Sequence, residues 1–446
     1  MTEALIHYIW QTRQYNAKDL RTTRGHRLFI IHPGYLNRDA GPDFLHAKVT
    51  IDGTLWAGHI ELHLRSSDWD LHGHSSDPAY SNVVLHVVLE HDMDIHFPGH
   101  GVPIPELELR PRISGSLVSL YRQFHENRRE FACEEYFPDV DASFVAIALQ
   151  RMAVERLEDK SRRAEQLVKT LRQDWQHCLI ALVARSLAGP VNADSAETLV
   201  CQLDPVLILR SRDDLLKLES LFLGAAGLLD RPKDDYSRRL HKEFLFWQQK
   251  HHIKPLPIHL WKYSRMRPEN FIDLRLAQLA AWIHYNDTLW SKLLSCRSWK
   301  ELRSLFQIRH RHYWSEHFRL GKRSERKVRS LGDSTIRLIL INALSPLIFH
   351  YGRHQGDPQY QERAMNWLSD IPPEENRVTR SWRPLGLSAE NGLESQALIH
   401  WKRNYCDEKA CARCPVGHHL FTKLAEPSGS SVLSRDDPSS QPNGGK

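Results

Sequence analysis

The sequence has no run of 18 uninterrupted apolar residues, so we predict no membrane-spanning helix. It has no glycine-rich phosphate-binding loop, which argues against an ATP-driven motor within this chain. Residues 1–11 have neither a basic segment nor a long apolar core, so we expect no secretory signal peptide. Only seven cysteines occur, at irregular spacing, which argues against a secreted disulfide framework. We therefore expect a cytoplasmic protein.

The composition is that of a globular protein with more than one domain. At roughly 150 residues per domain, 446 residues suggest two or three domains. Hydrophobic residues make up 41%, enough for a sizeable core. Lysine and arginine number 60 against 54 acidic residues, a net charge of +6. This mild excess is compatible with DNA or RNA as a partner.

Residues 1–115 predict an α+β domain with a small mixed sheet. A short helix is expected at 2–13. Asp52-Gly53 is the strongest hairpin signal in the chain. The nearly continuous apolar run 82–89 suggests a central strand covered on both faces. The expected strands are 26–34, 46–51, 54–65, 82–92 and 104–109.

The period of helices dominates the rest of the chain. We expect a large all-helical domain at 116–400, a cysteine-bearing segment at 401–425 and a disordered tail at 426–446. Pro346 is expected to kink its helix. The predicted helices are 142–171, 174–187, 213–228, 235–250, 270–285, 299–309, 334–350 and 357–368.

Asp43, Glu61 and His63 are the candidate catalytic residues. Phosphodiester cleavage with Mg²⁺ or Mn²⁺ needs carboxylates to hold the metal and a basic group to orient water. Glu61 and His63 stand two apart on a predicted strand, hence on one face, with Ile60 and Leu62 on the other. We expect Asp43 and Glu61 to bind the metal. The alternative is that this is an ordinary solvated strand face.

The strand register decides whether Asp43 reaches the other two residues. With a two-residue loop at Asp52-Gly53, Ile51 pairs with Thr54 and Asp43 falls opposite Leu62. This places Asp43 on the face away from Glu61. A β-bulge or a three-residue loop returns it to the same face.

Gly41–Asp43, followed after 17 residues by Glu61–His63, resembles the PD-(D/E)xK nuclease pattern. The resemblance implies a nuclease-like α/β core, in which Glu3 on the first helix matches an additional acid. The family's lysine position holds His63 here, and Lys48 on the neighbouring strand is a candidate substitute. Three functions stay open: a metal-dependent nuclease, a degenerate nuclease-like protein that binds nucleic acid, and a non-catalytic interaction or scaffold protein.

A dense polar segment follows the Glu61 strand, and we expect it to line the substrate site. Its simpler interpretation is a turn, with Trp69 in the core and Asp77 capping a short helix. His86, inside the apolar strand, is expected to be a core histidine. The predicted lining residues are His59, Arg65, Asp68, His72, His74 and Asp77.

Three cysteines fall within nine residues near the C-terminus: Cys406, Cys411 and Cys414. With nearby lysine and arginine, they suit a thiolate site for zinc or a 4Fe-4S cluster. Cys133 is the first choice for a fourth ligand, with His418 and His419 as local alternatives. Reduced structural thiols, or a Cys411/Cys414 redox pair, are the alternatives to a metal. The remaining cysteines, expected in the core, are Cys178, Cys201 and Cys296.

The arrangement of one distant cysteine and a group of three resembles that of the iron–sulfur-stapled nucleases of DNA recombination and CRISPR adaptation, although the spacing differs. A basic run at 319–329 is a candidate for phosphate contacts. Taken whole, the chain resembles an uncharacterised bacterial family known as domain of unknown function 2851, up to about residue 422. The segments that carry this resemblance are 32–44, 56–88, 267–271 and 394–417.

Overall fold

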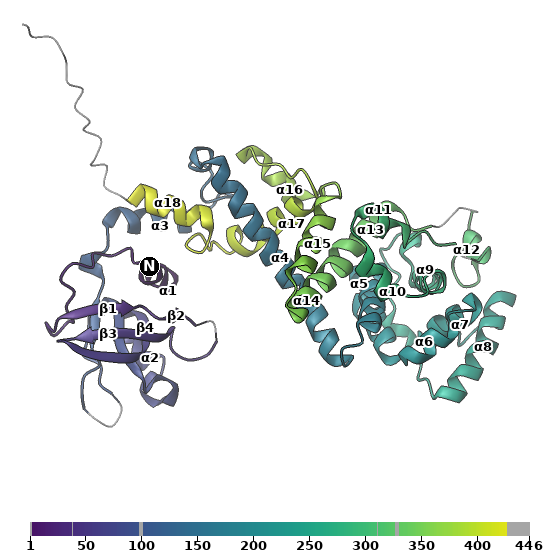
Figure 1. The fold of residues 1–446 in the computed structure, drawn as a ribbon, viewed down its shortest axis with the longest axis horizontal. Helices are drawn as coiled ribbons and strands as arrows, with labels where there is room; N and C mark the ends of the chain where they lie inside the picture. The colour runs from purple at the N-terminus through teal and green to yellow at the C-terminus, as the bar shows by residue number, and fades with distance from the viewer. Residues whose placement is uncertain (1, 38, 98–100, 310, 326–329, 426–446) are drawn as a thin grey trace, which may run out of the picture. The chain divides into compact units, whose positions relative to one another are not determined.

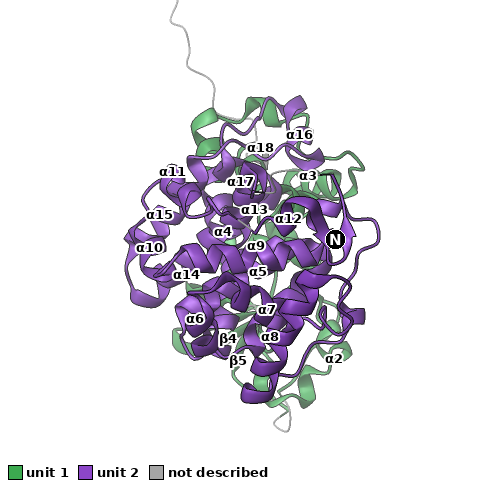
Figure 2. Cartoon of the chain, turned by 90° about the vertical axis from the view of Figure 1, so that its right-hand side faces the viewer, with its two compact units in different colours: residues 1–148, 402–446 green, residues 149–401 purple. Residues whose placement is uncertain are grey.

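The computed structural model describes residues 2–37, 39–97, 101–309, 311–325 and 330–425. The chain forms two compact units, coloured separately in Figure 2: residues 1–148 with 402–446, and residues 149–401. The boundary falls inside helix α4 (Ala142–Thr170). The first part of the predicted helical region, up to residue 148, thus belongs with the sheet, as does the cysteine segment from residue 402. The predicted tail, 426–446, lies outside the described residues.

Unit 1 is built on one mixed sheet in the order β1-β3-β4-β5-β6, with β2 beside β3. Figure 1 labels the strands β1 to β4 of this sheet. Neighbours among β1, β3 and β4 are antiparallel, whereas β4, β5 and β6 run parallel. This sheet and the helical region after it confirm the α+β prediction. The strands are β1 Leu28–His32, β2 Tyr35–Leu36, β3 Phe44–Ile51, β4 Thr54–Arg65, β5 Val83–Glu90 and β6 Glu106–Glu108.

The β5 strand is central and buried along nearly its whole length, as the apolar run predicted. A strand between two parallel neighbours, with both faces covered, exposes no side chain to water, so an almost continuous apolar run is stable there. His86 is the polar exception in the middle of β5, and it is fully buried. A buried imidazole needs polar partners.

A β-bulge sets the register between β3 and β4. Ile51 pairs with Thr54 across the Asp52-Gly53 turn, as the two-residue loop predicted. The register then shifts between Phe44 and Ala47, so that Phe44 pairs with Ile60. His46 takes the left-handed conformation there, with φ of 58°. The extra residue in β3 is what turns Asp43 toward Glu61.

Helices close unit 1 around the sheet. α1 (Glu3–Thr12) buries Ile9 and Trp10 and packs on β4. Phe421 on α18 packs against Phe124 on α3 with tilted rings whose centroids lie 5.2 Å apart. The other helical elements of this unit are α2 Asp68–Leu71, the 3-10 turns His74–Ser76, Pro78–Tyr80, Arg110–Arg112 and Phe137–Asp139, α3 Gly115–Glu126, the π-helix Lys402–Cys406 and α18 Pro415–Ala425.

Unit 2 is helical apart from a short hairpin. Its core contains several fully buried tryptophans, among them Trp282, Trp314 and Trp367. After α4 its elements are α5 Trp175–Gln202, α6 Pro205–Ser211, α7 Leu215–Ala225, α8 Asp235–His251, α9 Ile272–Tyr285, α10 Leu289–Ser295, α11 Trp299–Ser304, α12 Tyr313–Glu316, β7 His317–Arg319, β8 Lys322–Arg323, α13 Asp333–Ile339, α14 Ser345–Gln355, α15 Pro358–Ser369, α16 Arg377–Ser381 and α17 Gly392–Trp401, with 3-10 turns Ile258–Leu260, Pro268–Asn270 and Arg383–Leu385.

The predicted irregularity at Pro346 takes the form of a π-turn, Leu340–Leu344, between α13 and α14. Proline has no N–H for the carbonyl four residues earlier, which favours a wider turn before it. The continuous helix Asp333–Gln355 is long and apolar enough to cross a membrane. Most of it is buried in the protein. A buried core helix can have the same length and apolar composition, so this helix is weak evidence for a membrane span.

The described part of the basic run 319–329 is the β7–β8 hairpin. The guanidinium of Arg319 lies 4.1 Å from the ring centroid of Tyr263, and Arg323 pairs with Glu316 at 3.6 Å. These two cations thus have partners within the protein. Residues 326–329 lie outside the described part of the chain.

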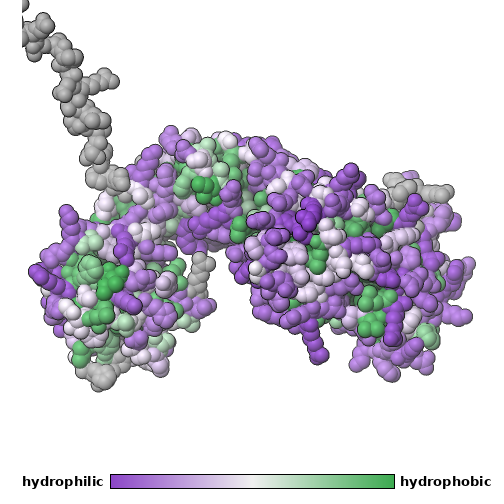
Figure 3. All heavy atoms as spheres, viewed as in Figure 1, coloured by the Kyte–Doolittle hydropathy of each residue, from purple (hydrophilic) through white to green (hydrophobic). Residues whose placement is uncertain are grey.

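The surface of unit 1 has apolar side chains on the outer part of the sheet. Phe29 and Leu55 lie on either side of Thr50 in the register of β1, β3 and β4 and are 66% and 60% exposed. Figure 3 shows hydrophobic residues at the surface of both units among a majority of polar ones. The candidate site lies elsewhere, where β4 meets α1 and the loop after α2.

Candidate metal centre

Strand β4 supplies the two central residues of the site. Glu61 and His63 alternate along β4 with Ile60 and Leu62, which fill the core on the opposite face. Glu61 is only 5% exposed and His63 only 1%. Burying a carboxyl group and an imidazole side by side is costly unless other polar groups or a metal satisfy them.

Asp43 meets Glu61 across the bulged strand pair. The backbone N–H of Asp43 donates to Glu61 Oε2 at 2.9 Å, and the backbone N–H of Leu62 donates to Asp43 Oδ2 at 3.0 Å. On the other side, His7 Nε2 on α1 lies 3.0 Å from Asp43 Oδ2. Asp43 thus lies beside Glu61, and Glu61 Oε1 lies 3.6 Å from His63 Nε2, so the structure brings these three predicted residues together.

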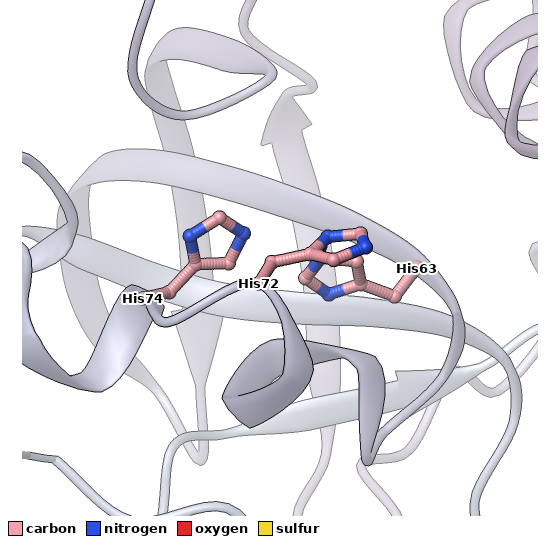
Figure 4. A group of neighbouring side chains, drawn as sticks. All are labelled: His63, His72 and His74. Carbon is pink, nitrogen blue, oxygen red and sulfur yellow. Dashed lines mark hydrogen bonds between the residues drawn. The ribbon is translucent and has the colours of Figure 1, made fainter.

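The loop that follows α2 adds two imidazoles. His72 Nδ1 lies 3.2 Å from His63 Nε2, and His74 Nε2 lies 3.3 Å from Glu61 Oε1. One ring nitrogen from each of these three histidines lies within 4.8 Å of the other two, and Figure 4 shows the rings grouped together. His74 Nε2 is buried and has no hydrogen bond within the protein. An unsatisfied ring nitrogen facing a carboxyl oxygen is the position a metal ligand would have.

The surroundings of His63 determine which of its nitrogens is protonated. His63 Nδ1 lies 2.9 Å from His86 Nε2, and His86 Nδ1 lies 3.0 Å from Glu106 Oε2, although not aligned for a hydrogen bond. The carboxylate favours a proton on His86 Nδ1, which leaves Nε2 as an acceptor for His63 Nδ1–H. His63 Nε2 then presents its lone pair to Glu61 and His72. Carboxylate–histidine pairs orient metal-binding imidazoles in this way.

Glu106 is itself held in place from its other oxygen. Its Oε1 accepts a hydrogen bond of 3.0 Å from Ser66 and lies 2.5 Å from His91 Nδ1. The side chain is buried, so these contacts offset the loss of water around it.

Electrostatics favour neutral imidazoles beside the buried carboxyl group of Glu61. Burial, followed by the charge of Asp43, raises the pKa of Glu61 well above its usual range. Burial, followed by the neighbouring imidazoles of His86 and His74, lowers the pKa of His63 to about 2. Burial also lowers the pKa of His74. A divalent cation would stabilise the charged carboxylates and use the neutral ring nitrogens as ligands.

The residues fit a transition metal better than magnesium. Carboxylates alone suit Mg²⁺ or Mn²⁺, which is what the sequence suggested. Imidazole ligands suit zinc, iron and nickel, whereas Mg²⁺ prefers oxygen. Glu61 with three histidines is a mixed nitrogen and oxygen set, which Mn²⁺, Fe²⁺ or Zn²⁺ would accept.

Lys48 is not brought to this group. It pairs with Ala57, four residues before Glu61 on β4, which is roughly 13 Å along the strand. Its side chain is exposed. His63 therefore occupies the position where the resembled pattern has its lysine, and the suggested replacement by Lys48 finds no support in the register.

The other predicted lining residues have local contacts. Asp68 accepts a hydrogen bond from the backbone N–H of Arg65 at 2.9 Å, and Arg65 is exposed. Asp77 caps the 3-10 turn Pro78–Tyr80, as the simpler interpretation had it. His59 Nδ1 lies 3.4 Å from the backbone nitrogen of His46 at the bulge. Of that set, only His72 and His74 join the site.

Two contributors were not identified from the sequence: His7 and Glu106. His7 stands four residues after Glu3, on the same face of α1, and that spacing was a usable signal. Glu106 is an acid inside a short apolar strand, which is a weaker signal. Glu3 itself is close enough to contribute to the raised pKa of Glu61, after burial and Asp43. Tyr80 stacks on His74 at 3.8 Å between ring centroids.

The four predicted cysteine ligands all lie in unit 1. Cys133 follows α3, Cys406 ends the π-helix, and Cys411 and Cys414 stand in the turn before α18. The remaining three cysteines lie in unit 2, with Cys178 and Cys296 buried and Cys201 half-buried. All seven lie in the described part of the chain, and none forms a disulfide.

Fold and site together define a two-unit α+β protein with a buried histidine–carboxylate cluster on its mixed sheet. The chain belongs to the family described as "Protein of unknown function (DUF2851)", whose model matches residues 3–377. The matched range contains the whole histidine–carboxylate cluster and ends before the C-terminal cysteines. No curated protein and no solved structure matches the chain.

Proposed function

We propose that unit 1 is a metal-dependent phosphodiesterase that cleaves nucleic acid, with a site similar to that of PD-(D/E)xK nucleases. The observation that supports it is the convergence of Asp43, Glu61 and His63, which the bulge in β3 makes possible. A register without the bulge would place Asp43 on the opposite face. A polar strand face with no function would not require burial of both Glu61 and His63.

Each residue has a distinct role in this proposal. Glu61, His63, His72 and His74 supply the metal ligands, and Asp43 adds a second carboxylate beside Glu61. His7 holds the Asp43 carboxylate from α1. A bound divalent metal would polarise a phosphoryl oxygen and lower the pKa of its water. Glu106, through His86, keeps the metal-facing nitrogen of His63 unprotonated.

The nucleic-acid substrate is supported by charge and by the resembled pattern. The chain carries a net charge of +6, which favours approach to a polyanion. Phosphodiester bonds are the substrates of the resembled nucleases. DNA and RNA are both to be tested as substrates.

The decisive experiment compares the full-length protein with Glu61→Gln. Both are assayed on single- and double-stranded DNA and RNA, with Mn²⁺, Zn²⁺ or Mg²⁺ added to metal-stripped protein. We expect Mn²⁺-dependent cleavage by the wild type and a loss of about 100-fold or more in the variant, because a metal ligand is removed. Glu90→Gln is the matched control, since Glu90 is a carboxylate on the adjacent strand that pairs with Arg110.

Two results would overturn the proposal. Metal binding by the wild type without cleavage of any substrate would assign the site to a nuclease-like binding protein. Equal cleavage by wild type and Glu61→Gln would place the activity elsewhere or in a contaminant. Equal loss in Glu61→Gln and Glu90→Gln would indicate damage to the sheet.

A further inference from the structure

Four cysteines from two separate segments lie in unit 1 and are not part of the β4 site. Cys133 precedes the 3-10 turn Phe137–Asp139. Cys406, Cys411 and Cys414 belong to the second segment of unit 1, which begins at residue 402. More than 270 residues separate the first from the others in sequence. Cys414 is buried and the other three are half-buried.

Specific packing brings the two segments together. α18 lies against α3 (Figure 1), with the ring of Phe421 packed at a tilt against that of Phe124. Lys409 Nζ donates a hydrogen bond of 2.6 Å to the carbonyl of His125 at the end of α3. Lys402 Nζ lies 5.3 Å from the ring centroid of Phe131, two residues before Cys133. The cysteine turn is therefore fastened to the segment that carries Cys133.

Gly417 allows the turn to fold closely onto α18. A Cβ atom at this position would lie only 2.1 Å from the carbonyl oxygen of Cys411, so no side chain fits. The backbone N–H of Cys414 also donates to the carbonyls of Ala410 and Cys411. This compact turn fixes the directions from which Cys411 and Cys414 present their sulfurs.

The thiols are close enough to affect one another's ionisation. Burial, followed by the neighbouring thiols of Cys414 and Cys411, raises the pKa of Cys133 to about 12. Burial and the other three cysteines raise the pKa of Cys406 well above its usual range. Four cysteines brought together from two distant segments, with only Cys414 fully buried, are not needed to fill a core. A metal centre gives them a purpose, because it binds all four as thiolates.

We propose that Cys133, Cys406, Cys411 and Cys414 ligate a 4Fe-4S cluster that ties the C-terminal segment to the segment after α3. The proposal does not depend on activity at the β4 site. Four cysteines from a close turn and a distant segment are a complete ligand set for a cubane.

A single zinc ion and a 4Fe-4S cluster require different spacings of the four sulfurs. A tetrahedral zinc with Zn–S bonds of ~2.3 Å holds its sulfurs about 3.8 Å apart. A cubane has its irons at separate corners and holds the four sulfurs further apart, and its iron and sulfide distinguish it from zinc.

Nearby cations suit the charge of such a cluster. Lys402 and Lys409 each lower the pKa of a cysteine in the set, Cys406 and Cys411 respectively, against the larger effect of burial. Lys402 is buried, and it is also paired with Asp407. Four thiolates around an iron–sulfur core carry net negative charge, which these ammonium groups stabilise.

The test is the iron and acid-labile sulfide content of the full-length protein purified without oxygen. We expect about four irons and four sulfides per chain, with broad visible absorption that reduction bleaches. Cys411→Ser and Cys133→Ser should lose the iron, the sulfide and the absorption. Cys201→Ser, a half-buried cysteine of unit 2, is the matched control and should keep all three.

Wild-type protein decides the proposal even if the variants fail to fold. Zinc without sulfide, or no iron after anaerobic reconstitution with Fe²⁺ and sulfide, would overturn it. Loss of iron in Cys411→Ser but full retention in Cys133→Ser would overturn the assignment of Cys133. The Glu61→Gln variant should keep the cluster, so failure at either site is recognised separately.

Discussion

The backbone N–H of Asp43 donates a hydrogen bond to the carboxyl group of Glu61, and the residue after Glu61 returns one to the carboxylate of Asp43. The two acids are thus held together by each other's backbone, across a strand pair whose regular register would separate them. The bulge at His46 is what permits this arrangement. The relationship makes Asp43 replaceable by a residue of the same shape without loss of the fold.

Asp43→Asn should keep the structure and lose the proposed activity. The Asn oxygen can still accept the hydrogen bond from Leu62, so we expect the free energy of unfolding to change by no more than about 1 kcal/mol. Metal-dependent cleavage should fall by about 100-fold or more, because one carboxylate charge is gone. Urea unfolding and cleavage assays measure the two effects.

Asp52→Asn is the matched control for this substitution. Asp52 belongs to the same hairpin and its Oδ1 also accepts a backbone hydrogen bond, from Arg27 at 2.8 Å, but it lies at the exposed turn. It should retain cleavage. If it loses as much activity as Asp43→Asn, the effect belongs to the hairpin and not to the site.

Lys48 and His63 compete for the place of the lysine in the resembled pattern. The register places Lys48 beside Ala57, away from Glu61, whereas His63 Nε2 lies 3.6 Å from Glu61 Oε1. We expect Lys48→Ala to keep cleavage within about twofold and His63→Gln to lose about 100-fold or more, because an interior metal ligand is lost. Comparable losses in both variants would show that the lysine acts despite the register.

Glu106→Gln should weaken metal binding without touching the metal ligands. Glu106 Oε2 lies against His86 Nδ1, and His86 Nε2 against His63 Nδ1. An amide removes the charge that favours this pattern of protons, so metal affinity should drop about 10–100-fold. Titration calorimetry with Mn²⁺ measures it.

Glu108→Gln on the same strand provides the comparison. Glu108 only accepts a long hydrogen bond, of 3.5 Å, from the backbone N–H of His91. It should bind Mn²⁺ as the wild type does. Unchanged affinity in Glu106→Gln would mean that the contact through His86 does not act on His63.

The sequence was most informative where a pattern is local. Alternation in β4, the Asp52-Gly53 turn and the apolar run of β5 each follow from neighbouring residues, and the structure has all three. The sequence predicted the bulge only as one of two ways, with a three-residue loop as the other, to bring Asp43 to the face of Glu61. Its position at His46 had no signal, because a left-handed histidine is not distinguished by composition.

The less predictable features depend on long-range pairing. His86 meets Glu106 because β5 and β6 run parallel with these two residues paired. Neither segment alone predicts this pairing. Likewise, residues 116–148 and 402–425 have ordinary helical periodicity, yet they join the sheet unit. Periodicity identifies helices, but tertiary packing decides which core they join.

Glu219 on α7 predicts a pH dependence of stability that is independent of both proposed metal sites. It is fully buried in unit 2, where Tyr236 donates to Oε2 and Trp314 Nε1 donates to Oε1 at 3.0 Å. Burial raises its pKa from an ordinary 4.5 to about 7, although these hydrogen bonds and Arg311 act against the rise. The folded protein thus favours the neutral acid.

The sign of the effect follows from the direction of the shift. Below pH 4.5 the group is neutral in both states and its charge costs nothing. As pH rises from about 4.5 to about 7, the unfolded state loses its proton first, so this group's contribution to folding stability falls, by about 3 kcal/mol at most. Above about 7 the contribution is constant.

Glu219→Gln isolates this contribution, because every other titrating group is shared by the two proteins. Urea unfolding followed by far-UV circular dichroism at pH 5 and pH 8 should give a variant whose stability, relative to wild type, rises by about 2–3 kcal/mol between the two conditions. Glu362→Gln, an exposed acid on α15, should show no such change. Parallel pH profiles for wild type and Glu219→Gln would mean that Glu219 is charged in the folded protein at neutral pH, stabilised by Arg311 and its two hydrogen bonds.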